Sequence, residues 1–421
     1  MEFGNIGNYY IIEPFIRGLH RVFANCEIRT TLQMSDRFCS DEKITVLPMG
    51  IYYAGKENDL LDARNDAESA RSFLQTGKLD TSSPFIKEVL WADIVIDLSG
   101  DIWGDNADFL GPNRFEVGLL RDQTAQMLGK KTAMLAGSPG PFEDERLRHM
   151  AQEVYKSFDL VTNREPLSTE LLKAAGFDCS KTLSLACPSF LFEPVERGAI
   201  DNFIGEMRTM PGEKKKPVIG FVLCGWNFEA GPFDAWPRED AEYKVFAEAV
   251  EYMSEVIGAR VCIFSHSNGF DPPPEAFRLK HGRDYPIAKQ LQHVLERRGL
   301  AKEFIVLDEI YDPWETKAII GRMDMLVSGR VHASVAALSQ SVPTVLMDYG
   351  HRPKAHKIRG FASVSGADEF VVDPFEDGAL RETIRNCWES SIEYRTRLSA
   401  HMPSVREEAM LHFRALKKFE P

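Results

Sequence analysis

Arg330 and His332 are the residues best placed for chemistry, because they stand between an expected strand and an expected helix. The chain there reads MDMLVSG, then RVH, then ASVAALSQ. Unpaired backbone N–H groups at the start of a helix attract anions, and an arginine can bind one carboxylate or phosphate through two parallel hydrogen bonds. Neither side chain suits an apolar core. The segment therefore predicts a binding site for a phosphate or a carboxylate.

A second candidate cation, Arg164, follows an expected strand at 160–162 and precedes an expected helix at 167–175. Ligands of open α/β sheets bind beyond the carboxyl ends of the strands, so this position favours a side chain that points into the ligand site. An ion pair with Glu165 or Asp159 is an equally good interpretation of the local sequence, because surface ion pairs are common and contribute little.

A basic stretch runs from 351 to 359 and contains no acidic residue, although the whole chain carries a formal net charge of -13. It follows an expected strand at 344–347, so we expect it to add positive potential beside the Arg330 site. A solvated surface loop is the alternative. The stretch holds His351, Arg352, Lys354, His356, Lys357 and Arg359.

Polar and glycine-rich turns follow other expected strands. Ser99-Gly100-Asp101 comes after the strand at 94–98, and GSPGP at 137–141 comes after the strand at 132–136. GNIGN at 4–8 is like a glycine-rich anion loop but has no strand before it, so it is weak evidence by itself. His266, with Ser267 and Asn268, follows the strand at 260–264 and could contact a sugar or be an ordinary loop histidine.

Several classes of protein are excluded by what the sequence lacks. It contains no HExxH, GxSxG or Walker motif, and its seven scattered cysteines form neither a disulfide framework nor a zinc site, so we expect reduced, mostly buried thiols and no bound metal. The net negative charge of the chain disfavours nonspecific binding to nucleic acid, which requires a basic surface. No apolar run is long enough to span a bilayer and no signal peptide is visible, so we expect a cytoplasmic protein, with peripheral contact to the inner face of the membrane left open.

Short apolar runs alternate with amphipathic stretches, which predicts an α/β protein with two Rossmann-like lobes, parallel sheets and an active site in the cleft between the lobes. The polar segment 192–217 is the expected boundary. We expect an N-terminal lobe at 1–205, a C-terminal lobe at 217–375 and terminal helices at 376–421, interrupted by Pro403, that pack back on the first lobe. The remaining expected strands are 44–47 in the first lobe and 218–223, 304–307, 325–327 and 370–372 in the second, with helices at 239–257, 287–298, 314–321 and 333–338.

These residues, in this order, resemble the polysaccharide pyruvyl transferase family, whose two-lobed fold is like that of the GT-B glycosyltransferases. The resemblance covers nearly the whole chain. Its most specific part is MDMLVSGRVHASVAALSQSVPTVLMDYGHRPKAHK, and the other matching segments are GNIGN, ADIVIDLSGD, GKKTAMLAGSPGPF and DLVTNREPLSTELLKAAGF. SGD at 99–101 stands where the family pattern has consecutive glycines, so Asp101 is a candidate for acceptor binding or catalysis.

The resemblance implies transfer of the pyruvyl group of phosphoenolpyruvate to two hydroxyls of one sugar, which forms a cyclic ketal and releases phosphate. The implied partners are phosphoenolpyruvate and a sugar or lipid-linked oligosaccharide, with no tightly bound cofactor and an undetermined need for a divalent metal. By the same resemblance, Arg164, Arg330 and His332 hold the donor. We expect His332, Arg330 and Asp101 to be the catalytic residues. The other expected donor-binding residues are Ser138, Gly140 and Lys357, and the expected acceptor-binding residues are Asn5, Asn8, Asp101 and His266.

Two other functions fit the same scaffold, because a fold does not fix a function. One is a glycosyltransferase that uses a nucleotide sugar. The other is a glycan-binding protein without activity, which the retained Arg164, Arg330 and His332 argue against. A carboxylate placed at the second-lobe strand ends to hold ribose hydroxyls would favour the nucleotide sugar, and the RVH segment supplies none.

Overall fold

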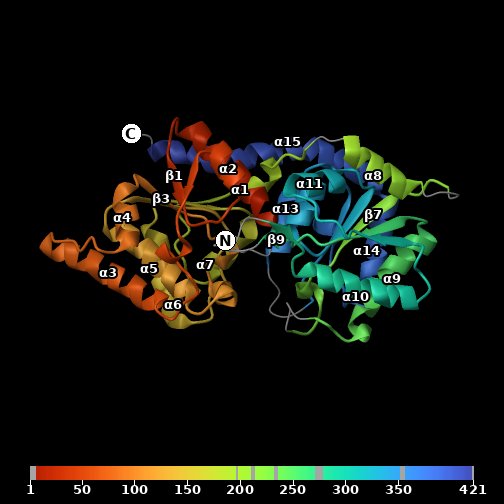
Figure 1. Cartoon of the computed structure of the whole chain (residues 1–421), viewed down its shortest axis with the longest axis horizontal. Helices are drawn as coiled ribbons and strands as arrows, with labels where there is room; N and C mark the ends of the chain where they lie inside the picture. Colours follow the sequence, from red (N-terminus) through yellow and green to blue (C-terminus); the bar gives the residue numbers. More distant parts are fainter. Residues whose placement is uncertain are drawn as a thin grey trace. The chain divides into compact units, whose positions relative to one another are not determined.

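The computed structural model describes residues 6–195, 198–209, 214–231, 236–270, 278–350 and 356–419. The chain forms two compact units. Unit 1 comprises Phe15–Pro188 and Glu408–Pro421, and unit 2 comprises Glu2–Pro14 and Ser189–Glu407. Both units are α/β, with helices packed around parallel strands, which confirms the predicted class of fold (Figure 1).

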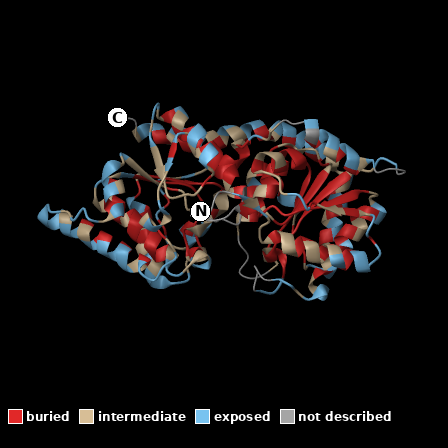
Figure 2. Ribbon diagram, in the orientation of Figure 1, coloured by how far each residue is buried: buried red, intermediate tan, exposed pale blue. Residues whose placement is uncertain are grey.

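Unit 2 is built on a sheet in which six described strands are all parallel, in the order β11-β8-β7-β12-β13-β14. This order is that of a Rossmann sheet, with its topological switch point between β7 and β12. The central strands are apolar and buried on both faces, as Figure 2 shows, because helices cover both sides of the sheet. The strands are β7 (Val218–Val222), β8 (Arg260–Ile263), β11 (Phe304–Val306), β12 (Met325–Ser328), β13 (Thr344–Met347) and β14 (Val371–Val372).

The helices of unit 2 fall into two groups, and each helix contacts other helices of its own group. Figure 1 shows α9 and α10 on the opposite side of the sheet from α8 and α11. One group is α9 (Lys244–Glu251), α10 (Asp284–Arg297) and α14 (Ala379–Glu389). The other is α8 (Gly198–Arg208), α11 (Pro313–Gly321), α12 (Val331–Leu338) and α13 (Lys357–Ser365).

Unit 1 contains a parallel sheet in the order β3-β4-β5-β6 and a separate parallel pair, β1-β2. Trp103 is the largest side chain of an aromatic core beneath the four-stranded sheet. The strands are β1 (Ile28–Thr30), β2 (Ile44–Val46), β3 (Ile94–Asp97), β4 (Lys131–Gly137), β5 (Leu160–Asn163) and β6 (Thr182–Ser184). The helices are α2 (Asp36–Asp41), α3 (Asp59–Thr76), α4 (Pro84–Trp91), α5 (Arg114–Met127), α6 (Glu145–Ser157) and α7 (Pro166–Ala174).

Three local expectations were wrong. The strand expected at 44–47 pairs with β1 in the small sheet, and the fourth strand of the larger sheet is β6, whose sequence TLS is too short and polar to predict a strand. The helix expected at 239–257 is divided into a 3-10 turn, α9 and a π-helical turn at Tyr252–Val256. The terminal helix α15 (Ser391–Ala415) runs through Pro403 without a break.

Helix α8 lies inside the segment expected to link the lobes. Its apolar face, formed by Ile200, Ile204 and Met207, packs in the core of unit 2 with Val218. The chain therefore passes from unit 1 to unit 2 at Pro188 and Ser189, rather than in the polar stretch after residue 205. The charge run at 214–216 lies beyond this helix.

Candidate functional site

The switch point of the unit 2 sheet is held together by one buried side chain, Asn227. Its Oδ1 accepts a hydrogen bond from the backbone N–H of Cys224, and its Nδ2 lies 3.4 Å from the carbonyl oxygens of both Met347 and Asp348. A Cβ on Gly329 would lie 1.8 Å from the Asn227 amide oxygen, so only glycine fits between β12 and α12. The carboxyl ends of β7, β12 and β13 are thereby joined where a Rossmann sheet binds its ligands.

Arg330 occupies the N-cap position of α12 at this edge, as the sequence predicted. Its Nε and Nη2 donate to the two carboxylate oxygens of Asp284, at 2.9 and 2.5 Å, and the Asp284 side chain is fully buried. One edge of the guanidinium is thus taken by a protein carboxylate. A bound anion would meet the other edge, formed by Nη1 and Nη2.

Asp284 is the main residue that the sequence analysis missed. It begins α10, and its backbone N–H donates to the Ser267 hydroxyl at 2.9 Å. Although burial disfavours a charged guanidinium, the Asp284 carboxylate raises the pKa of Arg330. Arg283, the next residue back along the chain, is a second cation of this cluster: burial lowers the pKa of its guanidinium, and the positive charge of Arg330 lowers it further. Because this cluster contains two arginines and one aspartate, its net charge is positive.

His332 lies in the first turn of α12, two residues after Arg330, and is half-buried. The Tyr10 ring packs against it with 6.3 Å between ring centroids, and the same tyrosine stacks on Phe192 at 4.4 Å. The imidazole is therefore held on an aromatic wall at the helix start. Its position suits either a contact to a bound anion or a proton transfer to one.

His266, predicted to contact the acceptor, points into the protein. Its side chain is 1% exposed, and its Nε2 lies 3.3 Å from the Tyr10 hydroxyl, which itself donates to the carbonyl of Pro313 at 3.2 Å. Burial, with the positive charge of Arg330 adding to it, lowers the pKa of His266 to about 3. The residue is a neutral packing group that supports Tyr10.

The basic stretch divides into parts with different partners. Arg359 donates through Nε to Asp348, whose side chain is fully buried, so its charge is neutralised within the fold. Lys357, at the start of α13, places its ammonium 5.9 Å from the centre of the Tyr349 ring. Tyr349 packs on Trp226, which lies in the 3-10 turn Gly225–Asn227 after β7. Residues 351–355 lie outside the described part of the chain, as does Asn5; Asn8 ends the short 3-10 helix Ile6–Asn8 in unit 2.

Unit 1 holds its own arginine-centred group at the ends of β3, β4 and β5. Arg164 is 4% exposed and donates through Nε to the Ser138 hydroxyl at 2.8 Å and through Nη2 to Asp101 at 3.3 Å. The alternative partners, Asp159 and Glu165, have other contacts: Glu165 caps α7 by accepting from the Ser168 backbone N–H at 2.9 Å. Asp101, 36% exposed, is therefore the carboxylate that faces Arg164.

The loops that carry this group are locked together by glycines. The Ser138 N–H donates to the Gly100 carbonyl, and the Gly140 N–H donates to the Trp103 carbonyl. A Cβ on Gly104 would lie 2.7 Å from the Gly140 Cα, and Gly100 has a φ of +64°, which favours glycine. Ser138 and Gly140 thus position Arg164 and Asp101, in addition to any contact that they make with a ligand.

Comparison with known proteins identifies the family. The family model for polysaccharide pyruvyl transferase matches residues 5–351. The chain belongs to this family. It is accordingly an enzyme of the pyruvyl transferase kind, as its motifs predicted. Amylovoran biosynthesis protein AmsJ from Erwinia amylovora is 25% identical over 365 residues, which cover 83% of this chain and 81% of that protein.

The fold of this pyruvyl transferase family member is shared with sugar-nucleotide enzymes. A glycosyltransferase from Rickettsia africae matches with a TM-score of 0.60 at 10% identity, covering 99% of this chain and 94% of the other. Anabaena Alr3699/HepE in complex with UDP matches with a TM-score of 0.58 at 12% identity, covering 99% and 96%. At these identities the likeness establishes a GT-B-like fold of two Rossmann-like units and nothing about the ligand.

Other features of the described residues bear on ligands. Within the described ranges, no group of three or more His, Cys, Asp or Glu side chains is arranged to hold a metal ion. All seven cysteines are free, and five of them are buried. No described helix combines the length and the apolar character needed to cross a bilayer.

Proposed function

We propose that this enzyme uses phosphoenolpyruvate as its donor and forms a cyclic pyruvyl ketal on a sugar of a polysaccharide repeat unit. The family supports pyruvyl transfer to a polysaccharide. A relative named for amylovoran biosynthesis supports a biosynthetic role. The donor, the ketal and the acceptor are the proposal.

The observation that carries the proposal is the geometry of Arg330. Asp284 fixes its guanidinium through one edge, so the other edge is held rigidly at the N-terminus of α12 beside His332. Phosphoenolpyruvate carries both a carboxylate and a phosphate, and an arginine edge, Arg283 and the helix N-terminus together provide the positive charge that such a ligand needs. A preorganised cation avoids the entropic cost of ordering a free side chain on binding.

The proposed reaction forms two C–O bonds and breaks one. One sugar hydroxyl attacks C2 of the donor while C3, the methylene carbon, takes up a proton and becomes a methyl group. The second hydroxyl then replaces phosphate at C2, and its proton leaves with the phosphate or a base. His332 is the proposed acid for C3, and it recovers its proton from the attacking hydroxyl.

Arg164 and Asp101 of unit 1 complete the proposed set. Arg164 is a buried cation whose carboxylate partner is partly exposed, so Asp101 can accept a proton from a sugar hydroxyl while it also orients Arg164. In this proposal Asp101 is the base for a sugar hydroxyl, and Arg164 is the cation that orients it. Ser138 keeps Arg164 in place through its hydroxyl.

Ligand-induced stabilisation and product analysis test the proposal directly. Phosphoenolpyruvate should raise the melting temperature of the purified protein, and UDP-glucose should not, because a ligand that binds only the folded state stabilises it by an amount that grows with the logarithm of the ligand concentration relative to Kd. With an extract of lipid-linked oligosaccharide as acceptor, phosphorus NMR should show phosphate formed from phosphoenolpyruvate, and proton NMR should show a new ketal methyl singlet. A shift with UDP-glucose alone would instead support a nucleotide-sugar glycosyltransferase.

A further inference from the structure

The turn that carries Asp101 is bonded at its two ends to two buried aspartates that the proposed function does not use. It is the 3-10 turn Gly100–Ile102, which follows β3 and precedes the 3-10 helix Asp105–Leu110. Asp97 is the last residue of β3 and is 8% exposed, and Asp122 lies in α5 and is 5% exposed. Aspartates are rarely buried this deeply unless they have partners, so both require contacts inside unit 1.

Asp97 holds the start of the turn through Ser99. The Ser99 backbone N–H donates to Asp97 Oδ1 and the Ser99 hydroxyl donates to Asp97 Oδ2, both at 2.8 Å. The Ile102 N–H then donates to the Ser99 carbonyl at 3.1 Å, which closes the turn around Asp101. Hydrogen bonds to an ionised acceptor are stronger than neutral ones, so Asp97 fixes both the backbone and the side chain of Ser99.

Asp122 holds the end of the turn through Trp103. The indole Nε1 of Trp103 donates to Asp122 Oδ2 at 3.1 Å. The same ring is 2% exposed and packs edge-on against Phe115, with 5.8 Å between ring centroids. Trp103 cannot move without disturbing the core of unit 1, so the residue two positions after Asp101 is anchored as firmly as the residue two positions before it.

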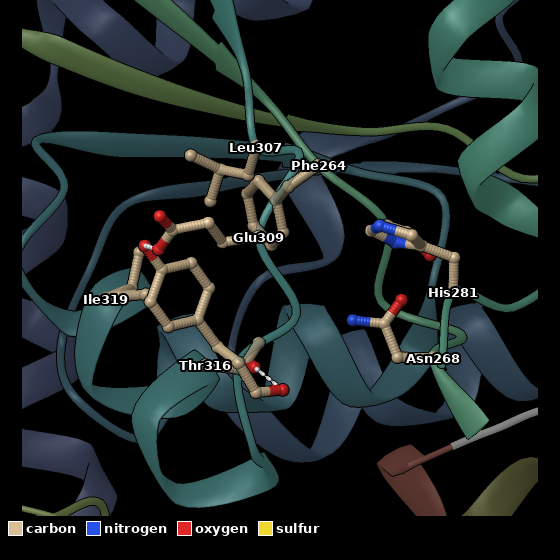
Figure 3. Close-up of a pocket in the computed structure, with 9 residues that line it drawn as sticks. Phe264, Asn268, His281, Leu307, Glu309, Thr316 and Ile319 are labelled. Carbon is tan, nitrogen blue, oxygen red and sulfur yellow. Dashed lines mark hydrogen bonds between the residues drawn. The ribbon is translucent and has the colours of Figure 1, made fainter. Parts of the chain in front are cut away.

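A small pocket of unit 2, at the ends of β8 and β11, shows buried polar groups of a different kind. Asn268 directly precedes β9 (Gly269–Phe270) and His281 directly follows β10 (Leu279–Lys280), and Figure 3 shows them together on one side of the pocket. Asn268 Oδ1 and His281 Nδ1 have no hydrogen-bond partner among the described residues. The cavity measures about 10 Å³, which is room for about one water. The oxygens of Asp97 differ, because both accept hydrogen bonds from the turn itself.

A second loop binds the backbone carbonyls of the turn. The Ser138 N–H donates to the Gly100 carbonyl at 3.1 Å, and the Gly140 N–H donates to the Trp103 carbonyl at 2.9 Å. These bonds leave the first backbone N–H of the turn to Asp97. The carboxylate of Asp97 is therefore a separate restraint, on the side of the turn that the second loop does not bind.

The two aspartates divide one negative charge between them unequally. Burial raises the pKa of Asp97, whereas its two hydrogen bonds from Ser99 and the charge of Arg114 oppose the rise. Burial, with the negative charge of Asp97 adding to it, raises the pKa of Asp122 well above its usual range, and one hydrogen bond from Trp103 opposes this. The larger number of donors assigns the charge to Asp97 and the proton to Asp122.

We propose that Asp97 is a positioning residue for Asp101: it acts through Ser99 to hold the turn in the orientation that the reaction requires. The task of Asp101 as a base rests on the proposed function, whereas the anchoring of the turn does not. Misplacement of a reacting group by about 1 Å costs about a hundredfold in rate, so a residue that only positions Asp101 changes turnover without touching a ligand.

Hydrogen exchange of the full chain, followed by mass spectrometry, tests the anchoring without any substrate. In Asp97→Ala the amides of residues 99–103 and 138–140 should exchange about tenfold faster or more, because local opening of the turn becomes easier. Ser99→Ala should give a smaller increase and keeps the test available if Asp97→Ala does not fold. Unchanged exchange in both variants would overturn the proposal.

Asp80→Ala is the matched control. Asp80 and Ser82 have the same spacing on the surface of unit 1, and the Ser82 N–H donates to Asp80 Oδ1 at 2.9 Å. Its loss should leave exchange at 99–103, and turnover, as in the wild type. An equal increase of exchange in Asp80→Ala would show a general loosening of unit 1 and would count against the role of Asp97.

Steady-state kinetics distinguish positioning from a contribution to folding alone. Asp97→Ala should lower kcat about tenfold to a hundredfold and Ser99→Ala about fivefold, with the calorimetric Kd for phosphoenolpyruvate changed less than about twofold. Asp97→Asn should restore kcat to within about threefold of the wild type, because its amide can accept from the Ser99 N–H and donate to the Ser99 hydroxyl oxygen. Folded Asp97→Ala with an unchanged kcat would make Asp97 a structural residue only.

The Asp101→Asn background shows whether Asp97 acts through Asp101. There, Asp97→Ala should reduce kcat by no more than about a further twofold, because residues that act through one group are not additive. The same loss in both backgrounds would overturn the proposal. A wild-type protein that does not turn over phosphoenolpyruvate would defeat the proposed function alone, because the exchange measurement still decides whether Asp97 anchors the turn.

Discussion

Each of the two units places an arginine directly after a buried strand and before a helix. The carboxylate that pairs with this arginine is buried in unit 2 and partly exposed in unit 1. Arg330 of unit 2 is held through two nitrogen atoms by Asp284, whose side chain is fully buried. Arg164 of unit 1 donates through Nη2 to Asp101 at 3.3 Å, and the Asp101 side chain is 36% exposed. The first carboxylate is part of the fold, and the second has access to solvent.

The difference in exposure assigns the two carboxylates different tasks. Asp284 positions Arg330, whereas Asp101 is accessible to a ligand. A buried ion pair is costly to break because the remaining charge is left without a partner, so Asp284 must stay in place when a ligand arrives. Asp101 is 36% exposed, so water can replace part of its own contact with Arg164 when it moves, and the Ser138 hydroxyl still accepts from Arg164. Sequence position alone made the two arginines look alike, and only their partners distinguish them.

The largest expected effect is on stability. Asp284→Asn leaves Arg330 charged and buried without a carboxylate and should lower the free energy of unfolding by about 3 to 5 kcal/mol. Asp101→Asn keeps an acceptor oxygen for Arg164 and changes a partly exposed side chain, so it should lower this free energy by about 1 kcal/mol. Urea unfolding of both variants, monitored by circular dichroism, measures the contrast. Similar losses in the two variants would remove the distinction between the units.

Arg330→Lys tests the free edge of the guanidinium. Lysine offers a point charge instead of a planar fork, so donor affinity and catalytic efficiency should fall by roughly thirtyfold or more, in line with about 2 to 5 kcal/mol for truncation of a desolvated charge contact. Calorimetric titration of phosphoenolpyruvate and phosphate-release kinetics give the two values. Arg381→Lys, at an exposed position of α14, is the matched control. Near wild-type efficiency in folded Arg330→Lys would show that the donor binds elsewhere.

His332→Ala should separate proton transfer from charge. If the imidazole protonates C3 of the donor, turnover should fall about a hundredfold while donor affinity changes by only a few fold. Steady-state kinetics together with titration of phosphoenolpyruvate distinguish the two effects. Equal losses in affinity and efficiency would instead make His332 a binding residue, like its neighbour Arg330.

The sequence predicted the positions of those site residues that come soon after a predicted strand. The apolar runs at 218–223 and 325–327 predicted β7 and β12, and the polar residues that follow β12 predicted the position of Arg330. Asn227 could have been found by the same rule, because it follows β7 within the run CGWN. Local order along the chain was enough for these features.

The rest depended on contacts between distant segments. Asp284 lies 46 residues before Arg330, and nothing in RDYPIAKQ marks it as an ion-pair partner rather than an ordinary first-turn acid. His266 has a polar neighbourhood in sequence, but the fold turns it towards Tyr10, 256 residues away. Asn268, two residues further on, lines a pocket instead. Without the tertiary packing, the two side chains cannot be told apart.

A buried histidine makes unit 1 sensitive to acid. His412 is fully buried between the Thr162 hydroxyl, at 2.7 Å, and the Ala186 carbonyl, at 2.9 Å. Burial lowers its pKa to about 4. As pH falls from about 6.5, the unfolded chain takes up a proton that the folded protein does not, so stability falls with pH. The loss is about 2 kcal/mol at pH 5.

His412→Gln, which still offers a donor and an acceptor, should abolish this part of the pH dependence. Urea midpoints at pH 5 and pH 7.5 should differ less in the variant than in the wild type, whatever the variant's stability at neutral pH. The buried His266 of unit 2, with its pKa of about 3, should leave a residual acid dependence in both proteins. An unchanged difference between the two pH values would show that His412 is not the responsible group.

The smallest expected effect concerns Lys357 at the start of α13, whose ammonium lies 5.9 Å from the centre of the Tyr349 ring. Lys357→Gln should slow the association of phosphoenolpyruvate about threefold at low salt, because positive potential near the Arg330 site steers an anion. Arg359→Gln should change stability more than association. Stopped-flow mixing at low and high ionic strength measures the rates, with Lys302→Gln, at an exposed position between α10 and β11, as the control. The effect of Lys357→Gln should vanish at high salt, where the screening length falls to about 3 Å. A salt-independent loss would mean that Lys357 contacts the donor directly and belongs with Arg330 among its ligands.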